Sequence, residues 1–446
     1  MRKSNKKFYN PIKLILIYLI GTELLYFFGP LDWQTKNIII LLLFLIISNL
    51  LLYLGYRSTM SKLINEGIND KKRYVPFISS ETTVLKYLRL IIPLNLVMTV
   101  ANLLRYSGLN VFSITQIFEN LLLGFNNAGA QYSAKFENAS LFGGEILAPL
   151  STALAPILWP VLPLSLFYFK KLTKINKTLI IFTIFFEVTR WISIGTNKGI
   201  VDIFLIFLSV YILQKNNKAI QTRRNYNSLI LFFIVMIFLS LGLYFFSNTI
   251  SSRIGDSMLI VQSLANNTQI DTNSLILKLF PDYLKITIIY VTLYLTQGYY
   301  GLSLTFNEQF IPMFGIGNSN FLIENIQEIF NNDIFRNTYQ YRIQHSGWDA
   351  QVNWHSIYTW LANDLSYIGV IILMFFIGKY IAIIYFRSIK YKDPLFIVLF
   401  SLMVIMIFYF PINNQIAAMP NTFMAFWFLN ILWLLGKVSK SLKKSV

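Results

Sequence analysis

The two histidines of the chain, His345 and His355, are the side chains best suited to proton transfer near neutral pH. Both lie in the longest polar interval of the sequence, 247–363. His355 shortly precedes an apolar segment that can hold it at a defined height above a membrane, so the sequence predicts it as a general base toward a hydroxyl group. His345 lies further from that segment. We expect it to be a second candidate base or a structural hydrogen-bonding group.

Basic side chains near apolar segments are candidates for binding a phosphate group. Arg190 and Lys198 lie at the end of an apolar hairpin, where a cation is costly unless it has a partner or a function. Arg253, Arg336 and Arg342 lie in the polar interval. A guanidinium binds phosphate oxygens through two parallel hydrogen bonds, whereas Lys198 also suits contact with lipid headgroups and loop arginines are ordinarily solvated. The depth of Arg190 in its segment makes it the first candidate for a functional cation.

Residues with metal-ligand spacing are absent from the sequence. The chain has no cysteine, its two histidines are not spaced as ligands, and neither His-Glu-x-x-His nor Asp-x-Asp occurs. The carboxylates Glu145, Glu308, Asp349 and Asp364 are expected to be helix caps, ion-pair partners or surface groups. The sequence therefore predicts no metal and no cofactor.

The elements that position these residues are apolar runs. The chain is 55% hydrophobic and 13% charged, too apolar for a soluble domain, so we expect an all-α, polytopic helical membrane protein. About ten transmembrane helices are predicted, at about 12–29, 37–56, 84–104, 146–169, 178–194, 200–214, 228–246, 365–386, 394–410 and 421–436.

The distribution of lysine and arginine predicts the orientation of these helices. Basic clusters follow alternate apolar runs, which places both termini in the cytoplasm and excludes nucleic acid as the reason for the net charge of +18. Three regions result. Residues 1–246 hold helices one to seven and a smaller outer loop at 105–145, with an interfacial helix over 111–125. Residues 247–363 form one large extracytoplasmic loop, and 364–446 hold helices eight to ten and a basic tail.

Two apolar segments depart from a simple spanning helix. The run 146–169 carries four prolines, which predict a kinked or broken helix. The run 284–306 has a short uninterrupted apolar part, and counting it as a span would reverse the orientation of the later basic clusters. We therefore interpret it as a re-entrant or interfacial helix, ending at a turn formed by residues 297–301.

Four short motifs point to a known family. They are Asn197-Lys198-Gly199 at the hairpin end, the sequence Gln-Gly-Tyr-Tyr-Gly at 297–301, Gly-Ile-Gly-Asn-Ser-Asn-Phe at 315–321, and His355 followed by Asp364 and Gly369. Together with one dominant outer loop, the chain from the fifth to the eighth predicted helix resembles the bacterial oligosaccharide repeat-unit polymerases of the Wzy type, which act on O-antigen and capsular polysaccharide and are related to the O-antigen ligases. Lysine stands at 198 where related enzymes often have arginine.

This resemblance implies a metal-independent integral-membrane glycosyltransferase. A hydroxyl of one polyprenyl-diphosphate-linked repeat unit would attack the anomeric carbon of another and release polyprenyl diphosphate, on the outer face of the bacterial cytoplasmic membrane. The catalytic residues would be His355, Arg190 and, as the weaker base, His345. Substrate and diphosphate binding would fall to Gln297, Tyr299, Tyr300, Lys198, Arg253, Arg336 and Arg342.

The partners that follow are donor and acceptor lipid-linked oligosaccharides, membrane lipids, and the chain-length regulator and flippase of the same pathway. A flippase or transporter of lipid-linked oligosaccharides is the alternative function, although such proteins tend to show internal repeats rather than one large loop. A membrane acyltransferase is a third interpretation, for which no acyl-donor motif is visible.

Overall fold

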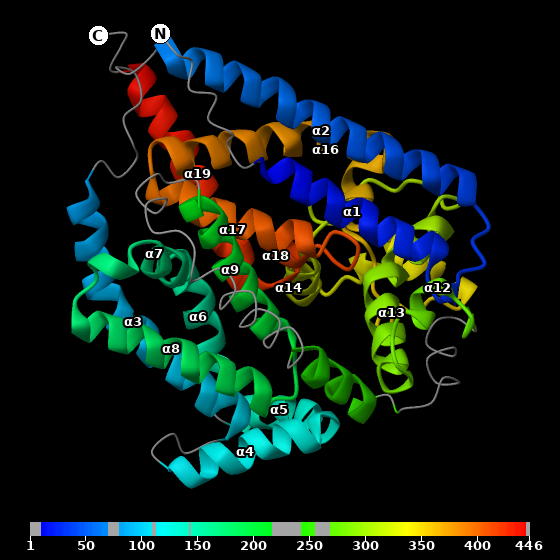
Figure 1. Cartoon of the computed structure of the whole chain (residues 1–446), viewed down its shortest axis with the longest axis horizontal. Coiled ribbons are helices and arrows are strands. Elements are labelled where there is room, and N and C mark those ends of the chain that lie inside the picture. The colour runs from blue at the N-terminus through cyan, green and yellow to red at the C-terminus, as the bar shows by residue number, and fades with distance from the viewer. Residues whose placement is uncertain are drawn as a thin grey trace.

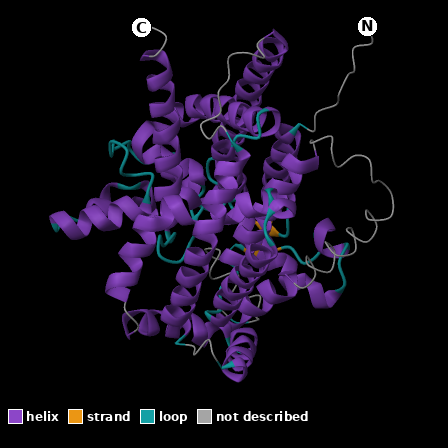
Figure 2. Ribbon diagram, turned by 90° about the vertical axis from the view of Figure 1, so that its left-hand side faces the viewer, coloured by secondary structure: helices purple, strands orange, loops and turns teal. Residues whose placement is uncertain are grey.

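The protein is an all-α membrane protein. The computed structural model describes residues 10–69, 80–108, 113–141, 144–215, 242–253, 255 and 268–442. Within these ranges it is almost entirely helical, with one short pair of strands (Figure 2). The prediction of an all-α chain is therefore confirmed.

The elements of the N-terminal half are α1 (Pro11–Phe28), β1 (Leu31–Asp32), α2 (Ile38–Asn69), α3 (Glu81–Ser107), α4 (Ile114–Asn126), α5 (Ala128–Leu141), α6 (Gly144–Leu158), α7 (Val161–Phe167), η1 (Phe169–Lys171), α8 (Lys174–Ser193) and α9 (Lys198–Lys215). Residues 242–253 are also helical and are called helix 242–253. The C-terminal half contains β2 (Gln269–Ile270), α12 (Leu275–Lys278), α13 (Asp282–Thr305), α14 (Asn320–Phe330), η3 (Ile334–Asn337), α15 (Tyr339–Arg342), η4 (Ile343–Ser346), α16 (Ile357–Lys390), α17 (Pro394–Phe408), α18 (Gln415–Ala418) and α19 (Pro420–Leu442).

Five of the described helical segments are long and apolar enough to cross a membrane: Pro11–Phe28, Ile38–Asn65, Glu81–Ser107, Ile146–Phe167 and Ile357–Lys390. They coincide with five of the ten predicted spans and make the chain a multi-pass membrane protein. Helices α8, α9, α17 and α19 occupy four further predicted positions without meeting the same length and hydropathy requirement. Most of the remaining predicted span, 228–246, lies outside the described residues.

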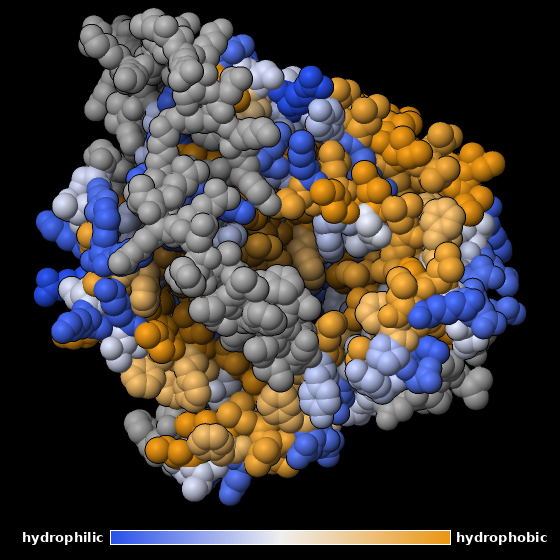
Figure 3. Space-filling model, viewed as in Figure 1, coloured by the Kyte–Doolittle hydropathy of each residue, from blue (hydrophilic) through white to orange (hydrophobic). Residues whose placement is uncertain are grey.

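Helices α2 and α16 lie side by side along the upper part of Figure 1. Glycines permit the contact, because a Cβ on Gly55 would lie 1.9 Å from the carbonyl oxygen of Phe375, and one on Gly378 would lie 2.1 Å from that of Leu52. Small residues allow this close backbone approach between membrane helices, where dispersion contacts replace the hydrophobic effect as the driving force. The opposite face of α2 exposes Ile39, Leu43 and other large apolar side chains. Figure 3 shows an apolar surface at its upper right, where α2 lies in Figure 1.

A second group of helices surrounds the α8–α9 turn, residues 194–197. Helices α3 and α8 lie side by side at the lower left of Figure 1, with α4 and α5 below them. Gly195 has φ +57°, and a Cβ there would lie 2.2 Å from the carbonyl oxygen of Ala128 on α5. A Cβ on Gly124 of α4 would lie 2.2 Å from the carbonyl oxygen of Ile192. Glycine is required at the turn because only glycine adopts this backbone conformation cheaply so close to another backbone.

Segments predicted to lie outside the membrane contact one another. Leu31 pairs with Ile270 and Asp32 with Gln269, which joins the first short outer loop to the large outer loop. The amide of Gly129, in the predicted loop 105–145, donates to Ser252 Oγ at 3.0 Å. These contacts join three segments that the sequence analysis places on one side of the membrane.

The structure corrects one prediction and confirms another. Residues 297–301 are part of the continuous helix α13 and do not form the predicted turn. All five of these residues are buried against neighbouring parts of the structure. The predicted break within 146–169 is confirmed: α6 ends at Leu158 and α7 begins at Val161, with Pro160 between them. Helix α16 is also kinked, because Ser366 has φ 58° and ψ 172°.

Candidate functional site

A cavity of about 380 Å³ lies between α3, α6, α8, α9 and the start of α19. Its wall carries the cations Arg105, Arg190 and Lys198 and the carboxylates Glu187 and Asp202. One positive charge is therefore uncompensated within the lining. Neither histidine of the chain lines this cavity.

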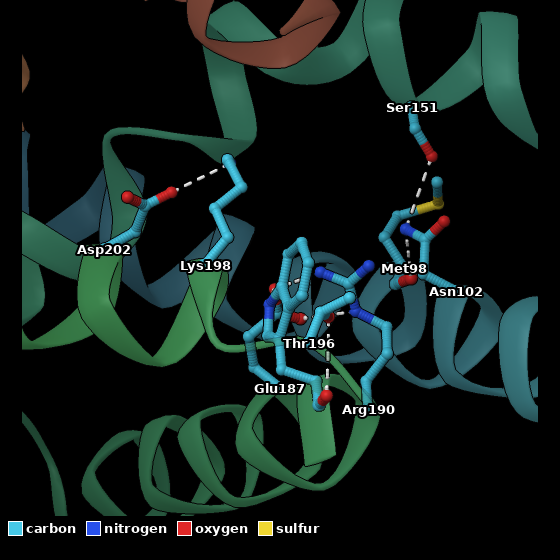
Figure 4. A network of polar contacts seen from close by, with 9 residues as sticks. Met98, Asn102, Ser151, Glu187, Arg190, Thr196, Lys198 and Asp202 are labelled. Carbon is cyan, nitrogen blue, oxygen red and sulfur yellow. Dashed lines mark hydrogen bonds and ion pairs between the residues drawn. The ribbon is translucent and has the colours of Figure 1, made fainter. Parts of the chain in front are cut away.

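Helical spacing explains why these polar groups converge. Asn95, Thr99, Asn102 and Arg105 follow one another at three or four residues along α3, so they share one face of that helix. On α8, Thr183, Glu187 and Arg190 show the same spacing, as do Lys198 and Asp202 on α9. Within the cavity wall, Asn102 Nδ2 of α3 donates to Ser151 Oγ of α6 at 3.4 Å (Figure 4). The result is a polar interior within an apolar bundle.

Arg190 is held in place by groups on its own helix. Its Nη2 and Nε donate to the two carboxylate oxygens of Glu187, the second over 3.3 Å, and its guanidinium carbon lies 4.3 Å from the centroid of Trp191. The Trp191 indole nitrogen donates to the same carboxylate at 3.0 Å. The Arg190 side chain is 13% exposed, so this pair lies in an environment where charges interact more strongly than in water.

Lys198 is the second predicted cation that lines the cavity. Its Nζ donates to Asp202 Oδ2 at 2.9 Å and lies 5.5 Å from the centroid of Trp191 (Figure 4). A Cβ on Gly199 would lie 1.8 Å from the Trp191 indole nitrogen, so glycine at this position makes room for the ring between the two cations. The Lys198-Gly199 motif therefore has a packing reason as well as an electrostatic one.

Arg105 is a cavity cation that sequence reasoning missed. Its guanidinium carbon lies 4.6 Å from the centroid of Tyr106, and its Nε is buried without a hydrogen-bond acceptor among the described residues. Tyr106 also lies 5.7 Å from the Arg190 guanidinium carbon, so one ring contacts two cations. The sequence feature that could have identified Arg105 is its helical spacing from Asn95, Thr99 and Asn102. Arg105 itself lies in the last turn of an apolar helix.

Arg253 lies against the α8–α9 turn but does not line the cavity. Its Nη2 donates to the carbonyl oxygen of Gly195, and its guanidinium carbon lies 4.0 Å from the centroid of Tyr132. Burial lowers the pKa of the Arg253 guanidinium. Of the five predicted phosphate-binding cations, the structure thus gathers Arg190, Lys198 and Arg253 around one hairpin.

His355 is buried, with 3% of its surface exposed. Its Nδ1 lies 3.4 Å from the position of a Cβ on Gly301, and neither ring nitrogen has a hydrogen-bond partner among the described residues. Burial lowers the pKa of His355 to about 3. A general base must reach the proton it removes and have a pKa near the working pH, and the burial of His355 opposes both requirements.

We expect His355→Leu, which keeps a similar volume and removes both unpaired nitrogens, to leave the amount of protein in the membrane unchanged, as read from an immunoblot. The unfolded histidine binds a proton near pH 6.5, whereas the native one resists it until about pH 3, so native stability should fall on acidification below pH 6.5. The melting temperature of His355→Leu should lack this decrease on acidification. An equal fall in melting temperature for the wild type and His355→Leu would contradict a buried, neutral His355.

The remaining loop cations form a separate group. The Arg342 Nη1 lies 3.5 Å from Glu308 Oε2, and His345 Nε2 lies 3.8 Å from Glu308 Oε1. The His345 side chain is 68% exposed, and its Nδ1 lies 2.5 Å from the carbonyl oxygen of Arg342. Arg336 pairs with Asp333 at 2.6 Å on the surface. None of these residues lines the cavity.

The predicted sugar-binding residues of α13 are packing residues in this structure. Gln297 Oε1 accepts from the Trp354 amide at 3.1 Å, and the Tyr299 hydroxyl shares a hydrogen bond of 2.9 Å with Thr22 Oγ1. Tyr300 stacks on Trp33 at 5.1 Å between centroids. All three predicted residues are buried. A Cβ on Gly298 would lie 2.0 Å from the carbonyl oxygen of Pro411, so the glycine serves close packing.

The third and fourth sequence motifs meet at Asp364. One carboxylate oxygen accepts from the amides of Gly315 and Gly317 at 2.8 and 3.0 Å, and the other from the amide and the side-chain nitrogen of Asn318 at 2.8 Å each. The neighbouring Asn363 donates to the carbonyl oxygen of Gly317 at 2.8 Å. This acidic residue therefore fixes the loop 313–319 to α16.

The cavity lining combines positive charge with hydrogen-bonding groups. Three cations reach it from three helices, and hydroxyl and amide groups on α3, α6 and α8 can donate or accept further hydrogen bonds. Comparison of the chain with protein-family models, with curated proteins and with solved structures finds no match.

Proposed function

We propose that the cavity binds the diphosphate of a polyprenyl-linked oligosaccharide and that the protein polymerises such repeat units by metal-independent glycosyl transfer. The observation that carries the proposal is the convergence of Arg105, Arg190 and Lys198 on one polar cavity within a membrane bundle. The four sequence motifs and the large loop add the resemblance to repeat-unit polymerases. Surface polysaccharide biosynthesis at the bacterial cytoplasmic membrane is the corresponding process.

In the proposed step, the oxygen of an acceptor hydroxyl forms a bond to the anomeric carbon of the donor chain, and the bond from that carbon to the diphosphate breaks. The bonding electron pair leaves with the diphosphate, whose charge the three cations stabilise. Positive charge fixed in place before reaction stabilises a leaving group without reorganisation. The cavity lining offers two carboxylates, Glu187 and Asp202, as acceptors for the hydroxyl proton.

Purified protein in liposomes that carry a polyprenyl-diphosphate oligosaccharide tests the proposal. We expect glycans of two or more repeat units and one released polyprenyl diphosphate for each new bond between units, with the same rate in the presence of a chelator of divalent ions. The matched variant is Glu187→Gln combined with Arg190→Gln, which removes both charges of one pair and should abolish elongation. Movement of the oligosaccharide to the other leaflet without elongation would contradict the polymerase and favour the flippase.

A further inference from the structure

A pair of cations that does not line the cavity lies beside the α8–α9 turn. The Lys135 Nζ lies 3.6 Å from the centroid of Tyr132, and the Arg253 guanidinium carbon lies 4.0 Å from the same centroid. We call Lys135, Arg253 and the Tyr132 ring the Lys135–Arg253 pair. It is formed by α5 and helix 242–253, which also touch where the Gly129 amide donates to Ser252 Oγ.

The charges of this pair are not neutralised by the described residues. Neither Lys135 nor Arg253 forms an ion pair with a described carboxylate, and Arg253 Nε is buried without a described acceptor. Burial, and next the charge of Arg253, lower the pKa of Lys135 to about 8. The titratable groups that act on Arg253 are Tyr294 of α13 and Tyr132. An anion would relieve the repulsion between the two cations.

A structural role explains only part of this arrangement. The hydrogen bond from Arg253 to the Gly195 carbonyl oxygen places a cation at the C-terminal end of α8, a favourable position relative to the helix dipole. That bond accounts for one nitrogen of Arg253. The hydrogen bond to Gly195 does not explain why Lys135 also lies against the Tyr132 ring.

The position of the pair links it to the cavity. Gly195, which Arg253 contacts, is three residues before Lys198, which lines the cavity. Three residue steps span at most about 11 Å of extended backbone. Two anionic groups bound at the pair and in the cavity would therefore lie close enough for the sugars attached to them to meet.

We propose that the Lys135–Arg253 pair binds the diphosphate of the second lipid-linked oligosaccharide, the acceptor, while the cavity binds the diphosphate of the donor. This inference rests on the proposed function, in which two molecules react and each carries a diphosphate. The donor diphosphate leaves at the cavity, and the acceptor diphosphate stays bonded to its sugar and needs only to be held. The Lys135–Arg253 pair suits that task, because it need not stabilise a leaving group.

Counting bound ligand tests the inference. The probe is a labelled isoprenyl diphosphate without sugar, added to the purified full-length protein in nanodiscs. We expect two molecules per chain for the wild type, and one for Lys135→Gln combined with Arg253→Gln. The Glu187→Gln and Arg190→Gln pair should also retain one. The control Arg57→Gln, at an exposed arginine of α2 that donates to the Tyr53 hydroxyl, should bind two.

The outcomes separate this inference from the proposed function. One molecule per chain, lost in the cavity variant and kept in the Lys135 and Arg253 variant, would overturn the inference and leave the proposed function standing. Two bound molecules in a protein that never elongates glycans would overturn the proposed function instead. Inorganic diphosphate should compete only weakly, and competition at equal affinity would overturn the assignment to a lipid.

Titration of Lys135 supplies a second measurement. The lysine loses its proton as the pH rises through about 8, so binding at the pair should weaken about tenfold between pH 7 and pH 9. Lys135→Arg keeps its charge throughout this range and should remove the pH dependence at that site. Identical pH profiles for the wild type and Lys135→Arg would contradict a role for Lys135 in binding.

Discussion

Replacing Arg190 with alanine is expected to slow the proposed chain elongation by about a hundredfold to a thousandfold while the protein remains in the membrane. Arg190 lines the cavity and is the most firmly held of its cations, because Glu187 accepts from two of its nitrogens. Loss of one preorganised group that stabilises developing charge lowers a rate by about a hundredfold to a thousandfold. Arg190→Lys should recover little, since an ammonium cannot make the paired contact with phosphate oxygens. The measurement is the release of polyprenyl diphosphate in proteoliposomes, alongside a polysaccharide ladder in cells.

Two further variants separate chemistry from folding. Arg190→Ala leaves the Glu187 carboxylate without its partner, and an unpaired buried charge destabilises a protein. The double variant Glu187→Gln and Arg190→Gln leaves no such charge, so it should fold and still fail to elongate. Arg336→Ala removes an arginine from an exposed pair with Asp333 and should elongate normally. Normal elongation by the folded double variant would remove Arg190 from the mechanism.

Local sequence patterns predicted much of the fold. Long apolar runs gave the positions of the five helices that are long and apolar enough to span a membrane, and proline density in 146–169 predicted the break between α6 and α7. The prediction of a turn at the glycine-containing segment 297–301 was wrong, because these residues continue helix α13. In the folded protein the missing side chains of Gly298 and Gly301 admit Pro411 and Trp348 against a continuous helix. Such contacts join residues far apart in sequence, so local patterns do not contain them.

The candidate site was predicted less completely than the fold. Arg190 was identified because a cation in a membrane helix is energetically costly, and Lys198 was identified by its position at the end of the predicted hairpin. The sequence did not identify Arg105 as a site residue, because α3 and α8 are far apart along the chain and meet only through tertiary packing. His355 was favoured from its place in the chain, whereas its burial depends on Gly301 and other residues outside its own segment. Spacing along one helix can therefore reveal a shared face, but it does not reveal which faces meet.

Replacing Asp364 with alanine is expected to release the loop 313–319 from α16. Four N–H groups donate to this carboxylate, and each hydrogen bond to a charged group contributes about 1.5–3 kcal/mol. The loop also contains Phe314 at φ 53°, a conformation that costs a non-glycine residue about 1–2 kcal/mol and needs surrounding contacts to persist. We expect a net local loss of about 3 kcal/mol.

Hydrogen exchange of the loop amides measures this loss. A change of about 3 kcal/mol corresponds to roughly a hundredfold faster exchange at Gly315, Gly317 and Asn318. Asp364→Asn keeps one acceptor oxygen and should give an intermediate rate. Asp333→Ala makes the same substitution at an exposed carboxylate, which accepts from Arg336 and Gln327, and should leave the loop unchanged. Unchanged exchange in Asp364→Ala would show that contacts such as those of Asn363 hold the loop without the carboxylate.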